Sequence, residues 1–236
     1  MRLDKYLAEM GKGTRSQLKQ DLKRGLVTVN GQVEKSADRK VDPSVDKVTY
    51  AGEDVSYVAY EYYLLHKPAG YISATEDRRQ ETVLDLIADR SRDDLFPVGR
   101  LDKDTEGLLL ITNDGDLAAR LTHPKYMKKK IYHVTCDKNV AMSDMDLLVN
   151  GIELEDGPVY ADEVSYVNEA DRSQIGVEIH SGKNRIVRRM LEHLGYRVNK
   201  LDRVLFAGLT KKNVKRGDWR YLTEKEVNML RMGAYE

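Results

Sequence analysis

The feature that most constrains the fold is the run GLLLITNDG at residues 107–115, where a continuous apolar stretch ends in turn residues. Such a run predicts a buried strand closed by an Asp-Gly turn, because a central strand has apolar neighbours on both faces. The preceding residues, 99–106, are rich in charged side chains. A charged loop that leads directly into a buried strand is a candidate position for polar chemistry.

Further short strands and helices alternate along the remainder of the chain. Strands are expected from near Tyr57 to Pro68, over IYHVTCD and over IGVEIH. Residues 116–122 suit a short helix, and the spacing of apolar residues over 185–194 predicts another. No internal repeat is present.

The first 55 residues read as a separate helix–turn–helix–hairpin unit. Leu3, Tyr6 and Leu7 follow helical spacing, and Thr14 with Gln17 fits a capping box before a second helix. Asn30-Gly31 is a type I′ hairpin signal. An acidic linker is expected near 51–56, so we predict one domain over 1–55 and a second over 57–236.

The neutral total charge conceals strong segregation of charge along the chain. Lys and Arg number 39, as do Asp and Glu. Residues 1–40 nevertheless carry a net charge of +5 and residues 183–220 carry +9, whereas residues 139–171 carry −9. The two basic segments are candidate surfaces for a polyanion, with 139–171 expected to lie away from them. The alternative is that they are solvated helix faces.

Composition and missing motifs exclude several functional classes. A single Cys excludes an internal disulfide framework and fits a reducing cytosol, so a cytoplasmic location is expected. The sequence shows neither a signal-peptide core nor an apolar run of membrane-spanning length. Glycine-rich phosphate-binding motifs and metal-ligand spacing of His and Cys are also absent from the sequence, so neither a cofactor nor a metal is expected.

The charged loop GRLDKDTEG contains two candidate carboxylates, Asp102 and Asp104. Either could act as a nucleophile or a base, and an adjacent Arg could orient a phosphate or keep the acid ionised. The residues alone do not choose between the two. The alternative is a turn in which Asp104 or Thr105 caps the following element.

Residues 181–190, SGKNRIVRRM, place a loop before a helix. Arg185, Arg188 and Arg189 have i, i+3, i+4 spacing, which predicts a shared basic face suited to phosphate. The alternative is an exposed face paired with the acidic segment 139–171.

A third stretch, KKKIYHV, has Tyr132 beside a basic run, as base stacking requires. A single strand Tyr is otherwise a core residue.

Together these stretches resemble the small-subunit-type family of ribosomal RNA pseudouridine synthases. The resemblance spans nearly the whole chain. Residues 1–31 are similar to the family's S4-type RNA-binding domain, and HKPAGYISA is similar to its first catalytic motif. The specific signature is GRLDKDTEGLLLITNDGDLAARLTHP, followed by KIYHV, SGKNRIVRRMLEHLGYRVNKLDRV and GDWRYLTEKEV. The resemblance implies an α+β fold: a small S4-like domain, then a catalytic domain with a mixed, mostly antiparallel sheet flanked by helices.

The resemblance also implies roles for individual residues. It selects Asp102 as the catalytic carboxylate, which either attacks the substrate covalently or removes a sugar proton. Arg100 is implied to help hold the RNA, Tyr132 to stack on the flipped uracil, and Arg188 to pair with Asp102. Leu201 is implied to face the base, and Lys67 and Pro68 to shape the pocket.

Phosphate contacts are expected from a further set of basic residues in the two basic segments. They are Arg2, Lys5, Arg15, Lys19, Arg24, Lys183, Arg185 and Arg189.

The sequence therefore predicts a monomeric enzyme that isomerises a uridine of ribosomal RNA, free or in an assembly intermediate, with 16S RNA favoured. Three alternatives stay open at this point. They are the same reaction on 23S RNA, a non-catalytic RNA-binding or ribosome-assembly factor, and a glycosidase that pairs Asp102 with Asp104.

Overall fold

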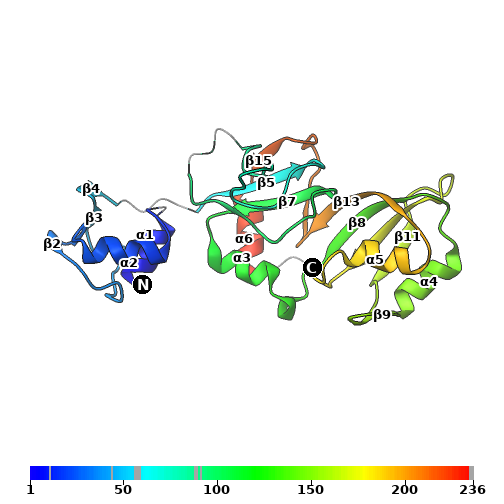
Figure 1. The fold of residues 1–236 in the computed structure, drawn as a ribbon, viewed down its shortest axis with the longest axis horizontal. Helices are drawn as coiled ribbons and strands as arrows, with labels where there is room; N and C mark the ends of the chain where they lie inside the picture. The colour runs from blue at the N-terminus through cyan, green and yellow to red at the C-terminus, as the bar shows by residue number, and fades with distance from the viewer. Residues whose placement is uncertain (11, 44, 56–59, 88–89, 91, 234–236) are drawn as a thin grey trace. The chain divides into compact units, whose positions relative to one another are not determined.

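The computed structural model describes residues 1–10, 12–43, 45–55, 60–87, 90 and 92–233 (Figure 1). The chain divides into two compact units, Met1–Glu61 with Arg90–Leu95, and Tyr62–Asp89 with Phe96–Glu236. The predicted strand start at Tyr57 and residue 56 of the predicted linker lie outside the described residues. No helix in the described part of the chain is long and apolar enough to cross a bilayer.

In the first unit, two helices pack on a four-stranded antiparallel sheet of order β2-β1-β3-β4. The elements are α1 Leu3–Glu9, α2 Arg15–Lys23, β1 Val27–Val29, β2 Gln32–Val33, β3 Val48–Tyr50 and β4 Glu53–Asp54. Thr14 caps α2 by accepting a hydrogen bond from the Gln17 backbone N–H. Asn30 and Gly31 both have positive φ, 53° and 80°, as the predicted hairpin turn requires.

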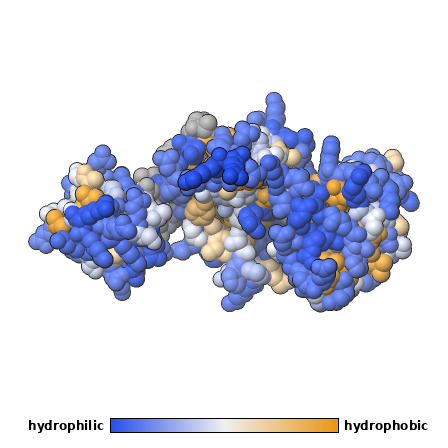
Figure 2. Space-filling model, viewed as in Figure 1, coloured by the Kyte–Doolittle hydropathy of each residue, from blue (hydrophilic) through white to orange (hydrophobic). Residues whose placement is uncertain are grey.

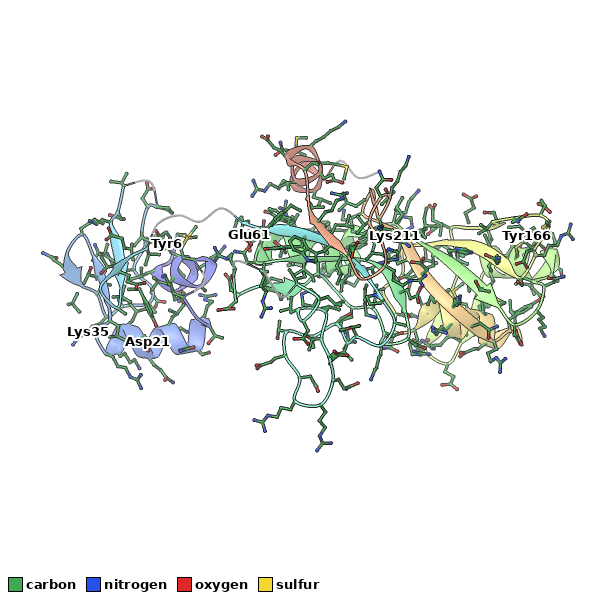
Figure 3. The ribbon with its side chains drawn as sticks, turned by 90° about the horizontal axis from the view of Figure 1, so that it is seen from above. Tyr6, Asp21, Lys35, Glu61, Tyr166 and Lys211 are labelled. Carbon is green, nitrogen blue, oxygen red and sulfur yellow. The ribbon has the colours of Figure 1, made fainter. Side chains whose placement is uncertain are left out.

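A buried carboxylate holds the first helix of this unit in place. Asp4 accepts hydrogen bonds from Arg2 (Nε–Oδ1, 3.1 Å) and from Arg15 (Nη2–Oδ2, 2.8 Å). Burial would raise the pKa of Asp4, but the hydrogen bonds from the two arginines outweigh it and hold the pKa below its usual range. Tyr6, labelled in Figure 3, donates to the Val55 carbonyl and ties α1 to the end of the unit.

The second unit is built on a nine-stranded mixed sheet whose main path is β11-β12-β8-β13-β7-β5-β15. All neighbours are antiparallel except β13 and β7, which are parallel. The mixed, mostly antiparallel sheet predicted from the family resemblance is therefore confirmed. The strands are β5 Tyr62–Lys67, β6 Phe96–Pro97, β7 Glu106–Thr112, β8 Lys130–Cys136, β11 Glu163–Tyr166, β12 Gln174–Ile179, β13 Val198–Phe206, β14 Leu209–Thr210 and β15 Trp219–Tyr221.

Helices cover this sheet. They are α3 Gly115–Thr122, η1 Pro124–Tyr126, α4 Met142–Asn150, α5 Ile186–His193 and α6 Glu224–Met232, and a separate hairpin comprises β9 Ile152–Leu154 and β10 Gly157–Val159. Apolar side chains of α4 and α5 join those of β8, β12 and β13 in one core. Hydrophilic residues cover most of the face seen in Figure 2.

The strand over 107–112 is buried as predicted, but Asp114 and Gly115 begin a helix and do not form the predicted Asp-Gly turn. The Asp114 side chain accepts a hydrogen bond from Leu117 N at 2.9 Å, and α3 begins at Gly115. Asp-Gly is here a helix start, because a carboxylate satisfies a free N–H of the first turn.

Gly107 allows β7 and β13 to approach more closely than any side chain would permit. Its φ is +117°, and a Cβ at this position would lie 2.4 Å from both the backbone N and O of Arg203. The parallel register pairs Gly107 with Arg203 and Glu106 with Asp202. This contact brings the charged loop at the start of β7 against the middle of β13.

We expect Gly107→Ala to lower the free energy of unfolding of the second unit by at least about 3 kcal/mol, because the methyl group meets rigid backbone. Gly115→Ala is the matched control, since a Cβ there has no atom within 4 Å. Urea titration monitored through Trp219 checks both variants. Equal midpoints for Gly107→Ala and the unmodified protein would contradict the close contact.

Candidate active site

A pocket of about 200 Å³ opens in the second unit where the charged loop, β8, β13 and the segment before α5 converge. Asp102, Arg100, Tyr132, Leu201, Lys183 and Arg185, all predicted from the sequence, line it. They come from segments far apart in the chain that the sheet order brings together. Arg188 and Arg189 are not among the described residues that line it.

The backbone of the charged loop is held by a buried lysine. Lys67 lies at the end of β5 and is fully buried, and its Nζ donates to the carbonyls of Asp102 (3.1 Å), Lys103 (3.4 Å), Thr105 (2.7 Å) and Pro68 (3.0 Å). Burial lowers the pKa of Lys67 from 10.5 to about 8, although neighbouring carboxylates oppose the shift. Lys67 therefore fixes the loop that carries Asp102, which agrees with the shaping role that the resemblance implied.

A serine holds the same loop from the other side. Ser73 Oγ accepts from Leu101 N at 3.0 Å and donates to Leu101 O at 2.8 Å. The position of Asp102 is thus set by backbone contacts on both sides of it.

Arg185 is the arginine that contacts Asp102. Its Nη1 lies 3.3 Å from Asp102 Oδ2 and 3.3 Å from Asp104 Oδ1. Arg185 stands just before α5 with a φ of +47°, outside the helix, and this conformation turns its side chain toward the charged loop.

The expected pairing of Arg188 with Asp102 is wrong in this structure. Arg188 is buried, and its Nη1 donates to Val198 O at 2.9 Å, while Nη2 contacts Asp104 Oδ2 at 3.1 Å. The predicted shared basic face of Arg185, Arg188 and Arg189 is also wrong, because Arg188 is buried and Arg185 precedes the helix. Asp104 faces Arg188 and is not among the residues that line the pocket.

The remaining predicted cations of this region are already paired with an acid. Asp156, at the turn between β9 and β10, contacts Arg189 Nη2 at 2.6 Å and Lys183 Nζ at 3.7 Å. The hydrogen bonds and charge of Arg189 and the charge of Lys183 hold the pKa of Asp156 at about 2. The expectation that all of 139–171 lies away from the basic segment is therefore wrong at Asp156.

Two basic residues that line the pocket, Lys130 and Arg203, were not among the predicted site residues. Lys130 donates through Nζ to the carbonyls of His180 (3.0 Å) and Ser181 (3.2 Å), and burial lowers its pKa to about 8. Arg203 is buried and lies directly opposite Tyr132 in the β13–β8 register. The available signal was the alternation of side chains along a strand. Lys130 is two positions from Tyr132 on β8, and Arg203 is two positions from Leu201 on β13, so each pair lies on the same face of the sheet.

In the first unit, the predicted phosphate contacts divide into two groups. Arg2 and Arg15 are tied to Asp4, with side chains 43% and 52% exposed. Lys19 and Arg24 are exposed on α2 and directly after it, and Lys5 is half-buried on α1. Among the described residues, no group of three or more His, Cys, Asp or Glu side chains is placed to hold a metal ion.

The chain belongs to the RNA pseudouridylate synthase family, which matches residues 61–193, and it also carries an S4 domain over residues 1–46. The ribosomal large subunit pseudouridine synthase B of Bacillus subtilis is 39% identical, over 98% of this chain and 95% of its own length. The ribosomal small subunit pseudouridine synthase A of Vibrio vulnificus is 35% identical, over 98% and 99%. A crystal structure of a pseudouridylate synthase, 29% identical, superposes with a TM-score of 0.68 over 98% of this chain and 99% of that one.

The protein is therefore an RNA pseudouridine synthase. Pseudouridine formation breaks the N1–C1′ bond of a uridine, turns the base and joins C5 to C1′, so an enzyme of this class must act on a uridine that has left its stack.

We expect Lys67→Met to lower the free energy of unfolding by about 2 kcal/mol or more, because it leaves buried carbonyls without a donor. The turnover rate should also fall, since the Asp102 loop loses its support. Lys103→Met is the control from the same loop, because Lys103 is exposed and its Nζ donates to the Gln80 side chain. Thermal unfolding and turnover measured together check both effects; normal turnover in Lys67→Met would contradict the loop's dependence on it.

Asp156→Asn should bind RNA more tightly than the unmodified enzyme and with a steeper salt dependence, because it releases Lys183 and Arg189 for phosphate. Asp146→Asn, an exposed position in the same acidic segment, controls for the change in net charge. Filter binding across a salt series measures both slopes. If the two variants gave the same slope, the pairing at Asp156 would not compete with RNA.

Proposed function

We propose that this enzyme converts a uridine of ribosomal RNA to pseudouridine, with Asp102 as its essential carboxylate. The observation that carries the proposal is the convergence of Asp102, Tyr132 and Leu201 on one pocket. A carboxylate, an aromatic ring and an apolar wall are what a flipped uracil and its sugar require. The small-subunit RNA, favoured by the sequence resemblance, is the first candidate substrate.

The large-subunit RNA is the second candidate. The Bacillus subtilis relative named for the large subunit is 39% identical to this chain, and the Vibrio vulnificus relative named for the small subunit is 35% identical. Both cover nearly the whole chain, so the experiment must include both RNAs.

Each pocket residue has a distinct part in the proposed reaction. Tyr132 stacks on the flipped base, and Leu201, which is 5% exposed, supplies an apolar contact from the neighbouring strand. Arg185 forms an ion pair with Asp102, the pairing that the resemblance had implied for Arg188. Arg100, exposed at the rim, contacts the RNA backbone. Asp102 then either bonds to the sugar or removes a sugar proton as the N1–C1′ bond breaks.

The two-carboxylate glycosidase alternative lacks its second acid in this pocket. Asp104 is turned to Arg188 and is absent from the described lining. A general acid and a base would both have to face the same bond. The glycosidase alternative also gives the S4-like unit no role, whereas in the proposed function this unit supplies phosphate contacts. The proposed enzyme acts as a monomer in the cytoplasm.

Asp102→Asn should reduce pseudouridine formation by at least about 10³-fold, because the amide can neither attack nor take a proton. Asp104→Asn, two positions away, should retain activity within about tenfold. Tritium release from C5-labelled 16S and 23S RNA, together with mapping of pseudouridines in a strain lacking the protein, measures the rate and identifies the target. Undiminished release by Asp102→Asn would refute the role of Asp102, and loss of a 23S site alone would replace 16S by 23S.

The double variant Lys19→Gln, Arg24→Gln should weaken RNA binding and reduce the slope of log affinity against log salt by about 0.7–0.9 for each lost contact. A second double variant, Lys138→Gln, Lys225→Gln, removes the same charge from exposed positions of the other unit. An unchanged slope in the first variant would contradict phosphate binding by the S4-like unit.

A further inference from the structure

Arg203 is a buried cation that faces the pocket with an unused donor. It lines the pocket and is only 3% exposed. Its Nε donates to Leu108 O at 2.9 Å, and its guanidinium lies 4.6 Å from the centre of the Phe206 ring. Its Nη2 is buried and has no hydrogen-bond partner among the described residues. No carboxylate of the described residues forms an ion pair with it.

Burying a cation without an acidic partner lowers the stability of the folded protein. The position of Arg203 at the pocket therefore indicates a ligand that carries negative charge. The strand register shows where that ligand would lie. Arg203 is paired with Tyr132 on β8 and with Gly107 on β7, and Leu201 is two positions earlier on the same strand. Arg203 thus lies between the Tyr132 ring, which is proposed to stack on the base, and β7, which follows the loop that carries Asp102.

Three other pocket cations already have protein partners. Lys130 Nζ donates to the carbonyls of His180 and Ser181, and Arg185 Nη1 contacts the carboxylates of Asp102 and Asp104. Lys183 Nζ donates to Asp156 O at 2.8 Å. Arg203 differs from these three because a buried nitrogen of its guanidinium, Nη2, is left to donate to a substrate.

The reaction generates a negative charge at this place. When the N1–C1′ bond breaks, its electron pair leaves with the uracil and is shared between N1 and the two carbonyl oxygens. In one route the Asp102 carboxylate bonds to C1′, and C5 of the turned uracil then displaces it. In the other route Asp102 removes the C2′ proton to leave a C1′–C2′ double bond, and C5 bonds to C1′ as Asp102 returns that proton to C2′. In both routes the C5 proton then departs to solvent. A donor aimed at a base oxygen stabilises the detached anion.

We propose that Arg203 Nη2 donates a hydrogen bond to a carbonyl oxygen of the flipped uracil and stabilises the uracil anion while it turns. This inference rests on the proposed function, and it makes Arg203 a catalytic residue. The alternative is that Arg203 only holds the Tyr132 ring in position.

A better leaving group separates these two roles. Fluorine at C5 withdraws electrons and stabilises the uracil anion, so the reaction depends less on an external donor. Single-turnover loss of the target nucleoside is measured for the same RNA carrying uridine or 5-fluorouridine, with wild type, Arg203→Met and Arg203→Lys. Arg197→Met is the control, because Arg197 is exposed just before β13 and outside the pocket.

Arg203→Met should slow the uridine reaction by about 10²-fold or more, as is typical for loss of one such donor. Fluorination should recover at least tenfold more rate in Arg203→Met than in wild type or Arg197→Met. RNA affinity should change less than threefold. If Arg203→Met fails to fold, Arg203→Lys carries the test, with a smaller loss and a fluorine effect still above that of wild type.

An equal fluorine effect in wild type and in the folded Arg203 variants, with the uridine reaction slowed, would overturn the proposal in favour of a positioning role. Loss of RNA affinity parallel to the loss of rate would overturn it as well. Absence of any conversion by wild type on ribosomal RNA would overturn the proposed function, and this inference with it.

Discussion

The site depends on the close contact of β7 and β13 at Gly107. These are the one parallel pair of neighbours on the main path of the sheet in the described residues, and a side chain at Gly107 would strike the Arg203 backbone at 2.4 Å. Because β7 follows the charged loop directly, the contact brings Asp102 to the middle of β13. There it meets Leu201, and Tyr132 on the next strand. The absence of a side chain at Gly107 therefore lets β7 and β13 approach each other and brings the pocket residues together.

Charge in and around the pocket is balanced by local pairs. Arg185 is shared by two carboxylates of the charged loop, and Arg189 and Lys183 contact Asp156. Basic and acidic groups, which are equal in number over the whole chain, therefore also lie close to one another around the pocket. RNA phosphates must compete with acids already in place, which favours a substrate that offers shape and a flipped base over one that offers charge alone.

Local patterns predicted local structure well. The cap at Thr14, the hairpin turn at Asn30-Gly31 and the buried run after Gly107 each follow from a few neighbouring residues. The ion-pair partners of the charged groups were harder to predict from the sequence. A periodic pattern indicates which residues share a helix face, but it does not indicate what packs against that face. Helical spacing grouped Arg188 with exposed arginines, whereas the packing of α5 on β13 buries it.

We propose that a uridine enters this pocket with its sugar beside Asp102 and its base against Tyr132. A crystal structure of Asp102→Asn bound to its target RNA would show this arrangement. We expect the flipped base against Tyr132 and Leu201, with C1′ next to the side chain at position 102 and a base oxygen within hydrogen-bond distance of Arg203 Nη2. A uridine seated outside the pocket, or with its sugar beside Asp104, would contradict it.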